Sequence, residues 1–151
     1  MSPPPPETLA RESRIQVPYA WSAGATLTRF LKGLRDSGRI EATRCPACAK
    51  AYVPPRRTCG ICFADCAEWL AVGPQGTLLS FTQAAYDSPA HPRPRPCFGL
   101  IRLDGADTAL LHLLGDFQPG ELEAGRRVEA VFAEARSGSV LDIRHFRPVR
   151  P

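Results

Sequence analysis

The sequence lacks any apolar run long enough to cross a membrane, and this absence argues against helical membrane spans. Its longest apolar stretches, such as Ala109–Leu114 with His112 inside it, extend over only a few residues, whereas a bilayer needs about 20. A secretory signal is also missing, because Met1 and Ser2 are followed by four prolines rather than by a charged and then an apolar region. We therefore expect a cytoplasmic protein that does not contact a membrane.

Lysine is also scarce, and the net charge is small. The chain has nineteen basic residues, of which only Lys32 and Lys50 are lysines, and its formal net charge is +4. This mild bias argues against a strong binder of polyanions. The excess of arginine suits bidentate contacts to phosphate or carboxylate groups. A genomic base composition that favours Arg, Ala, Gly and Pro together explains the same bias, since the arginines do not cluster in the sequence.

The chain divides into an arm and two modules. We expect residues 1–22 to form a flexible arm, because four consecutive prolines cannot enter the interior of a helix or a sheet. Tyr19 and Trp21 are apolar enough to dock on a partner. Residues 23–68 are expected to contain a helix and a cysteine module, and residues 69–151 a domain of short strands. A hydrophobic content of 44% is enough for a packed core.

Residues 26–37 predict a short amphipathic helix. Thr26 can cap its beginning, and Gly38 can end it in a left-handed turn. A lone helix of this length is marginal in water and needs a surface to lie on. The apolar positions repeat at the spacing of one helix face: Leu27, Phe30, Leu31 and Leu34.

The second module predicts a β-barrel. Short stretches rich in β-forming residues alternate with turns that contain glycine, proline or aspartate. Five such strands, with a longer connector after the third, fit a small Greek-key barrel of the OB type. The expected strands cover residues 77–86, 97–103, 108–114, 127–134 and 140–146.

The cysteines of the first module have the spacing of a metal ribbon. Two C-x2-C pairs, Cys45 with Cys48 and Cys59 with Cys62, are separated by ten residues. Two such knuckles on facing hairpins can place four thiolates at the corners of a tetrahedron around a structural Zn²⁺, with no position left for substrate. A four-cysteine cage also suits iron, and the sequence leaves this choice open. A redox pair is disfavoured, because no βαβ context surrounds the cysteines.

The residues around the knuckles carry further expectations. The position after each knuckle often adopts a left-handed conformation, and here it is held by Ala49 and Phe63 rather than by glycine, at a cost of about 1 kcal/mol. Cys66 is expected to be a buried or free thiol, although it can substitute as a ligand. Cys97, at the head of a strand, is expected to be a small core residue, since a nucleophile would need a base beside it.

Several motifs, in order along the chain, together resemble one known family. It is the bacterial and archaeal family described as acyl-CoA-associated, with an N-terminal rubredoxin-like zinc ribbon and a C-terminal OB fold. The resemblance covers about four fifths of the chain. The second knuckle departs from the usual Cys-Pro-x-Cys by having Gly60, which does not touch the ligands. The motifs are FLKGL at 30–34, GRI at 38–40, RCPAC at 44–48, PPR at 54–56, CGIC at 59–62, GPQGT at 73–77 after Trp69, SFT at 80–82, FGLIRLD at 98–104, GRRV at 125–128 and FRP at 146–148.

The resemblance implies an accessory subunit without catalytic residues of its own. Members of this family bind a thiolase-fold enzyme or a hot-dog hydratase and help hold or channel an acyl-CoA thioester. Four arginines are compatible with contact to the CoA phosphates or to the partner, namely Arg56, Arg57, Arg93 and Arg95. Each can equally be solvated or bound within the chain, and Arg56 can pack over the ribbon.

Two other functions stay open at this point. Zinc ribbons and OB folds also bind nucleic acid, but that reading needs stacking aromatics on the middle strands, where only Phe98 is found. A free-standing acyl-CoA enzyme would need a base, for which His91, His112 and His145 are the candidates. No nucleophile elbow, metal-hydrolase motif or phosphate loop accompanies these histidines, and His112 and His145 fall within strand patterns.

Overall fold

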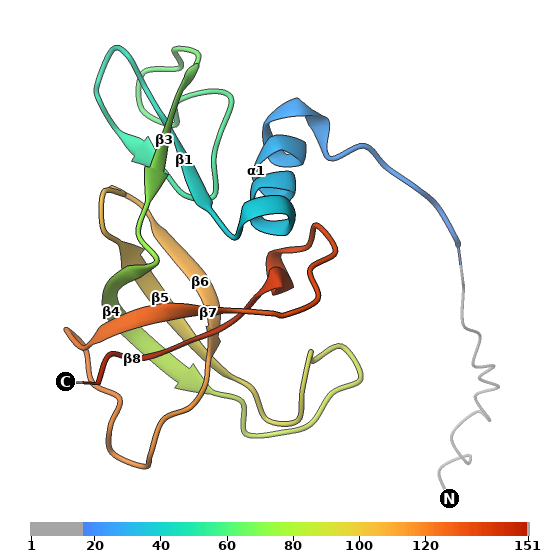
Figure 1. Ribbon diagram of the computed structural model, residues 1–151, viewed down its shortest axis with the longest axis vertical. Coiled ribbons are helices and arrows are strands. Elements are labelled where there is room, and N and C mark those ends of the chain that lie inside the picture. The colour runs from blue at the N-terminus through green and yellow to red at the C-terminus, as the bar shows by residue number, and fades with distance from the viewer. Residues whose placement is uncertain (1–16, 151) are drawn as a thin grey trace, which may run out of the picture.

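The computed structural model describes residues 17–150 and arranges them as a helix, a small sheet and a barrel (Figure 1). The helix α1 (Gly24–Ser37) comes first, a three-stranded sheet follows, and a closed five-stranded barrel completes the chain. The predicted mainly β fold is therefore confirmed. Residues 17–23 form no helix or strand and extend away from the body in Figure 1. The first part of the predicted arm, residues 1–16, lies outside the described residues.

Helix α1 ends as predicted but begins differently. Thr26 is not the cap: the N-cap position is Ala23, and Ser22 lies one residue before it with its Oγ accepting a hydrogen bond from the Gly24 N–H at 3.2 Å. At the other end Gly38 has a φ of 61°, and its N–H donates to the Leu34 carbonyl at 3.1 Å. A left-handed glycine is the usual way to satisfy the last carbonyls of a helix.

The small sheet has the order β2-β1-β3, with β1 (Ile40–Arg44) in the centre. Strand β2 (Ala51–Tyr52) pairs with the end of β1, and β3 (Glu68–Val72) pairs with β1 along its whole length. All pairings are antiparallel. Strand β3 then leads into the barrel, so the strand that enters the second module also completes the sheet of the first.

The barrel has the strand order of an OB fold. Its neighbours are β4-β5-β6-β8-β7, and β4 closes the barrel by pairing with β7. Every neighbouring pair is antiparallel except β6 and β8, which are parallel. This arrangement confirms the predicted OB fold. The strands are β4 (Gln75–Gln83), β5 (Cys97–Leu103), β6 (Ala109–Leu114), β7 (Arg127–Phe132) and β8 (Ile143–Pro148).

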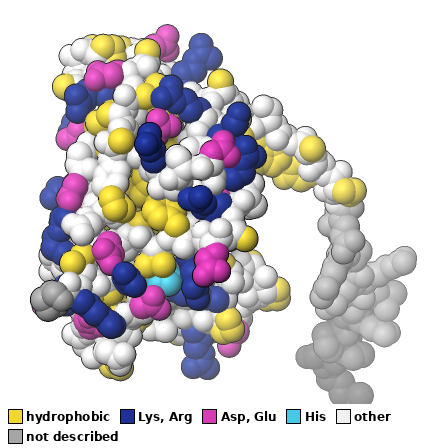
Figure 2. All heavy atoms as spheres, in the orientation of Figure 1, with side chains coloured by type: hydrophobic (Ala, Val, Ile, Leu, Met, Phe, Trp, Pro, Cys, Tyr) yellow, Lys and Arg dark blue, Asp and Glu magenta, His cyan; other side chains and the backbone are white. Residues whose placement is uncertain are grey.

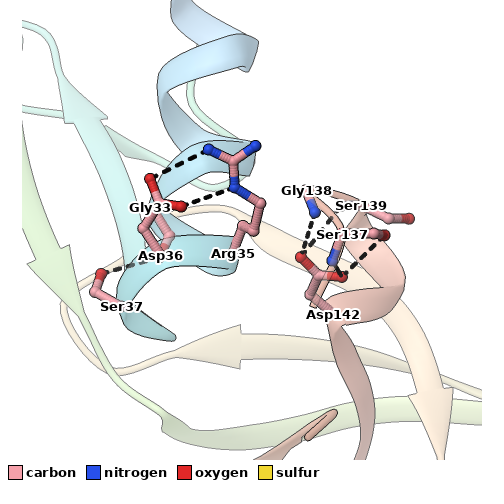
Figure 3. A network of polar contacts seen from close by, with 8 residues as sticks. All are labelled: Gly33, Arg35, Asp36, Ser37, Ser137, Gly138, Ser139 and Asp142. Carbon is pink, nitrogen blue, oxygen red and sulfur yellow. Dashed lines mark hydrogen bonds and ion pairs between the residues drawn. The ribbon is translucent and has the colours of Figure 1, made fainter. Parts of the chain in front are cut away.

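The strand predicted over residues 140–146 is wrong in its first part. Residues Val140–Asp142 form a 3-10 turn, η1, and β8 begins only at Ile143. The buried Asp142 carboxylate favours this turn, because it binds the backbone of the residues just before it. It accepts hydrogen bonds of 2.9, 2.8 and 3.2 Å from three consecutive N–H groups, those of Ser137, Gly138 and Ser139 (Figure 3).

One continuous apolar core joins the helix, the small sheet and the barrel. Phe30 and Leu34 of α1 pack in the same cluster as residues from β1, β3 and the barrel interior. The amphipathic helix therefore has the surface that its sequence requires. The most buried members are Phe30, Leu34, Ile40, Ala42, Leu78, Ile101, Leu103, Leu114, Val128, Ile143 and Phe146.

Polar contacts fix the ribbon sheet on the barrel. The backbone N–H of Ala51 donates to the Asp107 carboxylate at 2.8 Å, and its carbonyl accepts from the Asp107 N–H at 2.9 Å. The Val53 N–H donates to the Thr108 hydroxyl at 2.8 Å. The turn between β5 and β6 thus holds the chain that leaves β2, and the two modules share both a core and a hydrogen-bonded seam.

The surface carries both signs of charge without separating them. On the face that Figure 2 shows, basic and acidic side chains alternate across the molecule. Several arginines are paired, such as Arg147 with Glu129 at 2.8 Å and Arg29 with Glu41 at 3.2 Å. Between residues 17 and 150, no helix combines the length and the apolar character needed to cross a bilayer.

Asp142→Asn is expected to lower the free energy of unfolding by about 1–2 kcal/mol at neutral pH, because the amide leaves its backbone donors poorly satisfied. Burial alone would raise the pKa of Asp142, but the surrounding N–H groups outweigh this and lower it. The stabilisation is therefore present above the ordinary carboxyl pKa of about 4 and is lost as the pH falls through the lowered value. Urea unfolding of wild type and Asp142→Asn at neutral pH and in acid measures both the loss of stability and its dependence on pH.

Asp36→Asn is the matched control. The Asp36 carboxylate is exposed and pairs with Arg35 at 2.7 Å, close to the Asp142 network in Figure 3. An exposed pair of this kind contributes little to stability. Equal losses for the two variants would show that the three N–H contacts of Asp142 do not stabilise the fold.

Candidate metal centre

Two knuckles with the same backbone pattern hold the four predicted ligands. The N–H of Ala49 donates to the Cys45 carbonyl at 2.9 Å, and the N–H of Phe63 donates to the Cys59 carbonyl at 3.2 Å. Both residues adopt the predicted left-handed conformation, with φ values of 60° and 61°. The first knuckle joins β1 to β2, and the second lies between the bridged residues Thr58 and Asp65, before β3. The sheet therefore brings the two knuckles face to face.

The four cysteine sulfur atoms converge on one point. The Sγ atoms of Cys45, Cys48, Cys59 and Cys62 all lie within 4.8 Å of one another. The Cys45–Cys62 and Cys48–Cys59 sulfur distances are 3.4 and 3.5 Å. A tetrahedron of thiolates about 2.3 Å from a zinc ion has sulfur–sulfur edges of about 3.8 Å. The cluster therefore fits a single tetrahedral metal ion.

The electrostatics of the cluster favour a bound cation once the cysteines are ionised. Backbone N–H groups around Cys62, with the Tyr52 hydroxyl, lower the pKa of Cys59 to about 5. The Lys50 N–H lowers the pKa of Cys48, but burial and the neighbouring sulfur atoms outweigh it and raise the pKa to about 12. Four thiolates this close cannot all be ionised without a positive charge between them. A divalent metal would supply that charge, and a closed four-thiolate shell leaves no position for substrate.

Tyr52 supports the cluster, and sequence reasoning did not identify it. Its hydroxyl lies 3.1 Å from the Cys59 Sγ in a buried contact, and this contact raises the pKa of Tyr52 to about 12. The hydroxyl thus stays protonated and can donate to the thiolate, as outer-shell groups of metal sites do. The only sequence signal for this role is the position of Tyr52 in the short strand that follows the first knuckle.

Cys66 packs beside the cluster without belonging to it. Its side chain is buried with those of Cys45 and Cys59, and burial raises the pKa of its thiol. The four-sulfur group does not include it. The expectation of a buried free thiol is confirmed.

The two arginines between the knuckles have different environments. The Arg56 guanidinium lies over the Tyr52 ring, 5.5 Å from its centroid, so the expected packing over the ribbon is found. A Cβ at Gly60 would come within 3.3 Å of this guanidinium, which explains why glycine suits the second knuckle. Arg57 is exposed and lines a cavity of about 550 Å³ with Trp69 and the first turn of α1.

The other two predicted contact arginines lie far from the ribbon. They belong to the loop of residues 84–96, at the opposite end of the molecule in Figure 1. The Arg93 guanidinium donates to the Leu114 carbonyl, at the end of β6. Arg95 is exposed, and its N–H donates to the Asp87 carboxylate at 3.0 Å. The structure therefore does not bring the four arginines together, and their role stays a prediction.

The candidate bases are engaged within the fold. His145 is buried, and its Nε2 lies 2.8 Å from the exposed Asp116 carboxylate. His112 is buried as well, and its Nε2 contacts the Val140 carbonyl at 3.1 Å. Burial lowers the pKa of His112. The expectation that both are packed residues of the barrel is confirmed.

Cys97 and His91 do not form a nucleophile and base. Cys97 is buried, and burial raises the pKa of its thiol, which disfavours the reactive thiolate. The His91 ring instead lies beside that of Tyr86, with centroids 5.4 Å apart. The expectation of a small core residue at position 97 is confirmed.

Comparison with known proteins identifies both modules. A family profile described as "ChsH2, rubredoxin-like zinc ribbon domain" matches residues 33–67, and one described as "ChsH2, C-terminal OB-fold domain" matches residues 69–133. No curated protein matches the sequence.

Among the solved structures that resemble this chain, two cover more than four fifths of it. One is described as "Ltp2-ChsH2(DUF35) aldolase": it has 23% sequence identity and a TM-score of 0.62, over 85% of this chain and 98% of that chain. The other is a DUF35 protein of unknown function from Sulfolobus solfataricus, with 20% identity and a TM-score of 0.61, over 83% and 84% of the two chains. At these identities the likeness shows a shared fold.

Arg93→Ala is expected to loosen the loop of residues 84–96 and to lower the free energy of unfolding by about 1–2 kcal/mol, because the Leu114 carbonyl loses a charged donor. Hydrogen exchange of the loop and urea unfolding measure these effects. Arg95→Ala removes only an exposed pair with Asp87 at 3.9 Å and should change neither. Similar exchange rates in wild type and Arg93→Ala would contradict this anchoring role.

Proposed function

Because this chain belongs to the ChsH2 family, in which a rubredoxin-like zinc ribbon precedes an OB fold, we propose that it is a non-catalytic partner subunit of a thiolase-like enzyme. The enzyme would act on an acyl-CoA thioester, and this subunit would help hold or channel it. A hot-dog hydratase is the alternative partner. The main support is that the two family matches follow one another across residues 33–133. The two matched modules share one core and one hydrogen-bonded seam.

The engaged side chains also support an accessory role. The candidate bases and the candidate nucleophile are buried in the barrel or packed against a neighbouring ring in a loop, which fits a subunit whose partner carries out the reaction. The solved relative is named as an aldolase that pairs Ltp2 with ChsH2. By analogy, this chain would occupy the ChsH2 position in a comparable assembly.

The metal that we propose for the four cysteines is Zn²⁺, in a structural role. Cys45, Cys48, Cys59 and Cys62 would hold it, and the Tyr52 hydroxyl would stabilise one of the thiolates. The ion would neutralise the charge of the ligands and lock the two knuckles together. Iron in the same cage is the competing assignment, and metal analysis of the purified protein separates the two.

The exposed arginines are the better candidates for the CoA phosphates. Arg56, Arg57 and Arg95 are all exposed, but the Arg56 guanidinium packs on Tyr52, and Arg93 is half-buried and bound to the Leu114 carbonyl. We propose that Arg57 contacts the CoA phosphates, because it borders the cavity beside Trp69. The expected effect of Arg57→Ala is a higher KM for acyl-CoA in the assembled enzyme with the fold unchanged.

Purification of the tagged protein from its own host tests the main proposal. A thiolase-like or hydratase subunit is expected in near-equal amount, identified by mass spectrometry, with activity on acyl-CoA only when both subunits are present. Elution of this chain alone, or with nucleic acid, would contradict the proposal. A free-standing enzyme would instead show activity on acyl-CoA without a second subunit.

Cys48→Ser is expected to abolish stoichiometric zinc and to unfold the ribbon, because three thiolates no longer close the coordination shell. Elemental analysis and circular dichroism measure the two effects. Cys66→Ser is the matched control, since its thiol is buried beside the cluster but outside the four-sulfur group. Retention of the metal and an unchanged melting curve in Cys48→Ser would refute the four-thiolate assignment.

A further inference from the structure

The two knuckles together form an apolar end of the molecule, which we call the ribbon tip. Each of its residues is exposed, and none of their side chains is charged. The tip lies beyond the ends of β1 and β3 that point away from the barrel (Figure 1). Its members are Pro46, Ala47, Ala49, Gly60, Ile61 and Phe63.

Phe63 is the central feature of the tip. Its side chain is 79% exposed, and that of Ile61 is 61% exposed, so neither contributes much to the core of this chain. Phe63 also has a φ of 61°, a left-handed conformation that glycine adopts without cost. The fold therefore gains little from an aromatic ring at this position and would tolerate glycine.

The backbone under the ring is fixed. The Phe63 N–H donates to the Cys59 carbonyl, and the Cys59 N–H donates to the Ala64 carbonyl at 2.9 Å. An aromatic side chain on such a rigid base loses little conformational freedom on binding. Rigid aromatic groups that enter a pocket dominate the affinity of many protein interfaces. The tip has the properties of such an anchor.

We infer that the ribbon tip inserts Phe63 and Ile61 into an apolar pocket of the thiolase-like partner subunit. This inference rests on the proposed function, because it names a contact surface for that partner. The choice of this partner over nucleic acid or a second copy follows from the charge of the tip and from the area that the tip can bury. None of the six tip residues is charged, and the nearby Arg56 and Lys50 are engaged with Tyr52 and Asp107, which disfavours a nucleic-acid backbone as the partner.

A second copy of this chain is a poorer occupant. Two tips in contact would bury roughly 600 Å², if each Phe63 and Ile61 side chain contributes about 150 Å², and a specific interface buries at least about 1,200 Å². A convex tip gains more by entering a concave surface on another protein, where the ring is covered from all sides.

Phe63→Gly and Ala49→Gly form a matched pair for the test. Both replace a left-handed residue of a knuckle with glycine, at φ values of 61° and 60°, but only the first removes a ring. Metal content and melting temperature should therefore be alike for the two variants. In copurification from the host, Phe63→Gly is expected to retain at least about tenfold less thiolase-like subunit than wild type, and Ala49→Gly as much as wild type.

The outcomes separate this inference from the proposed function. Wild type that captures no thiolase-like subunit would overturn both. Wild type and Phe63→Gly that capture it equally would leave the proposed function intact and overturn the docking of the tip. Equal losses for both variants would assign the effect to the knuckle backbone and also overturn the role of the ring.

A photoreactive phenylalanine derivative at position 63 tests the contact directly, even if Phe63→Gly fails to fold. Irradiation in host cells is expected to join this position to the thiolase-like subunit, as identified by mass spectrometry. The same derivative at Leu141, an exposed residue of η1, reports random collisions. Cross-links only to a second copy, to another class of protein or to none would overturn the inference.

Discussion

The convergence of four cysteine sulfur atoms is the constraint on which the first half of the fold depends. The strands of the ribbon sheet have only two to five residues, and its own buried cluster is mainly cysteine and Tyr52. Strands this short do not form a stable sheet without further support. The same sulfur atoms would repel one another as thiolates, and the metal ion proposed for this site would both neutralise that charge and join the knuckles.

The effect of this centre extends to the barrel, because the ribbon is not an appendage. Strand β1 pairs with β3 over its full length, and β3 leads directly into β4. Phe30 and Ile40 belong to the same core as Leu78 and Ile101. The shared core holds the two ends of the molecule in a fixed relation, with the apolar ribbon tip at one end and the loop of residues 84–96 at the other (Figure 1).

The arginines show how composition can mislead about function. Many of them serve the fold or its surface, as in the pairs with Glu129 and Glu41 and in the contact between Arg93 and Leu114. Because acidic partners surround them, the molecule has no extended field of one sign on the face in Figure 2. Recognition of a phosphate group would therefore depend on a few exposed side chains such as Arg57, and not on the overall charge.

The sequence by itself determined the features that depend on local spacing. The cysteine pairs predicted the knuckles, Gly38 the end of α1, and the alternating strands the OB barrel. The tertiary structure decided everything that depends on groups distant in the chain. The Asp107 carboxylate accepts from the Ala51 N–H across 56 residues, and His145 contacts Asp116 across 29 residues. Spacing fixes which residues share a turn or a face, but long-range contacts depend on how the core places whole elements, which no local pattern encodes.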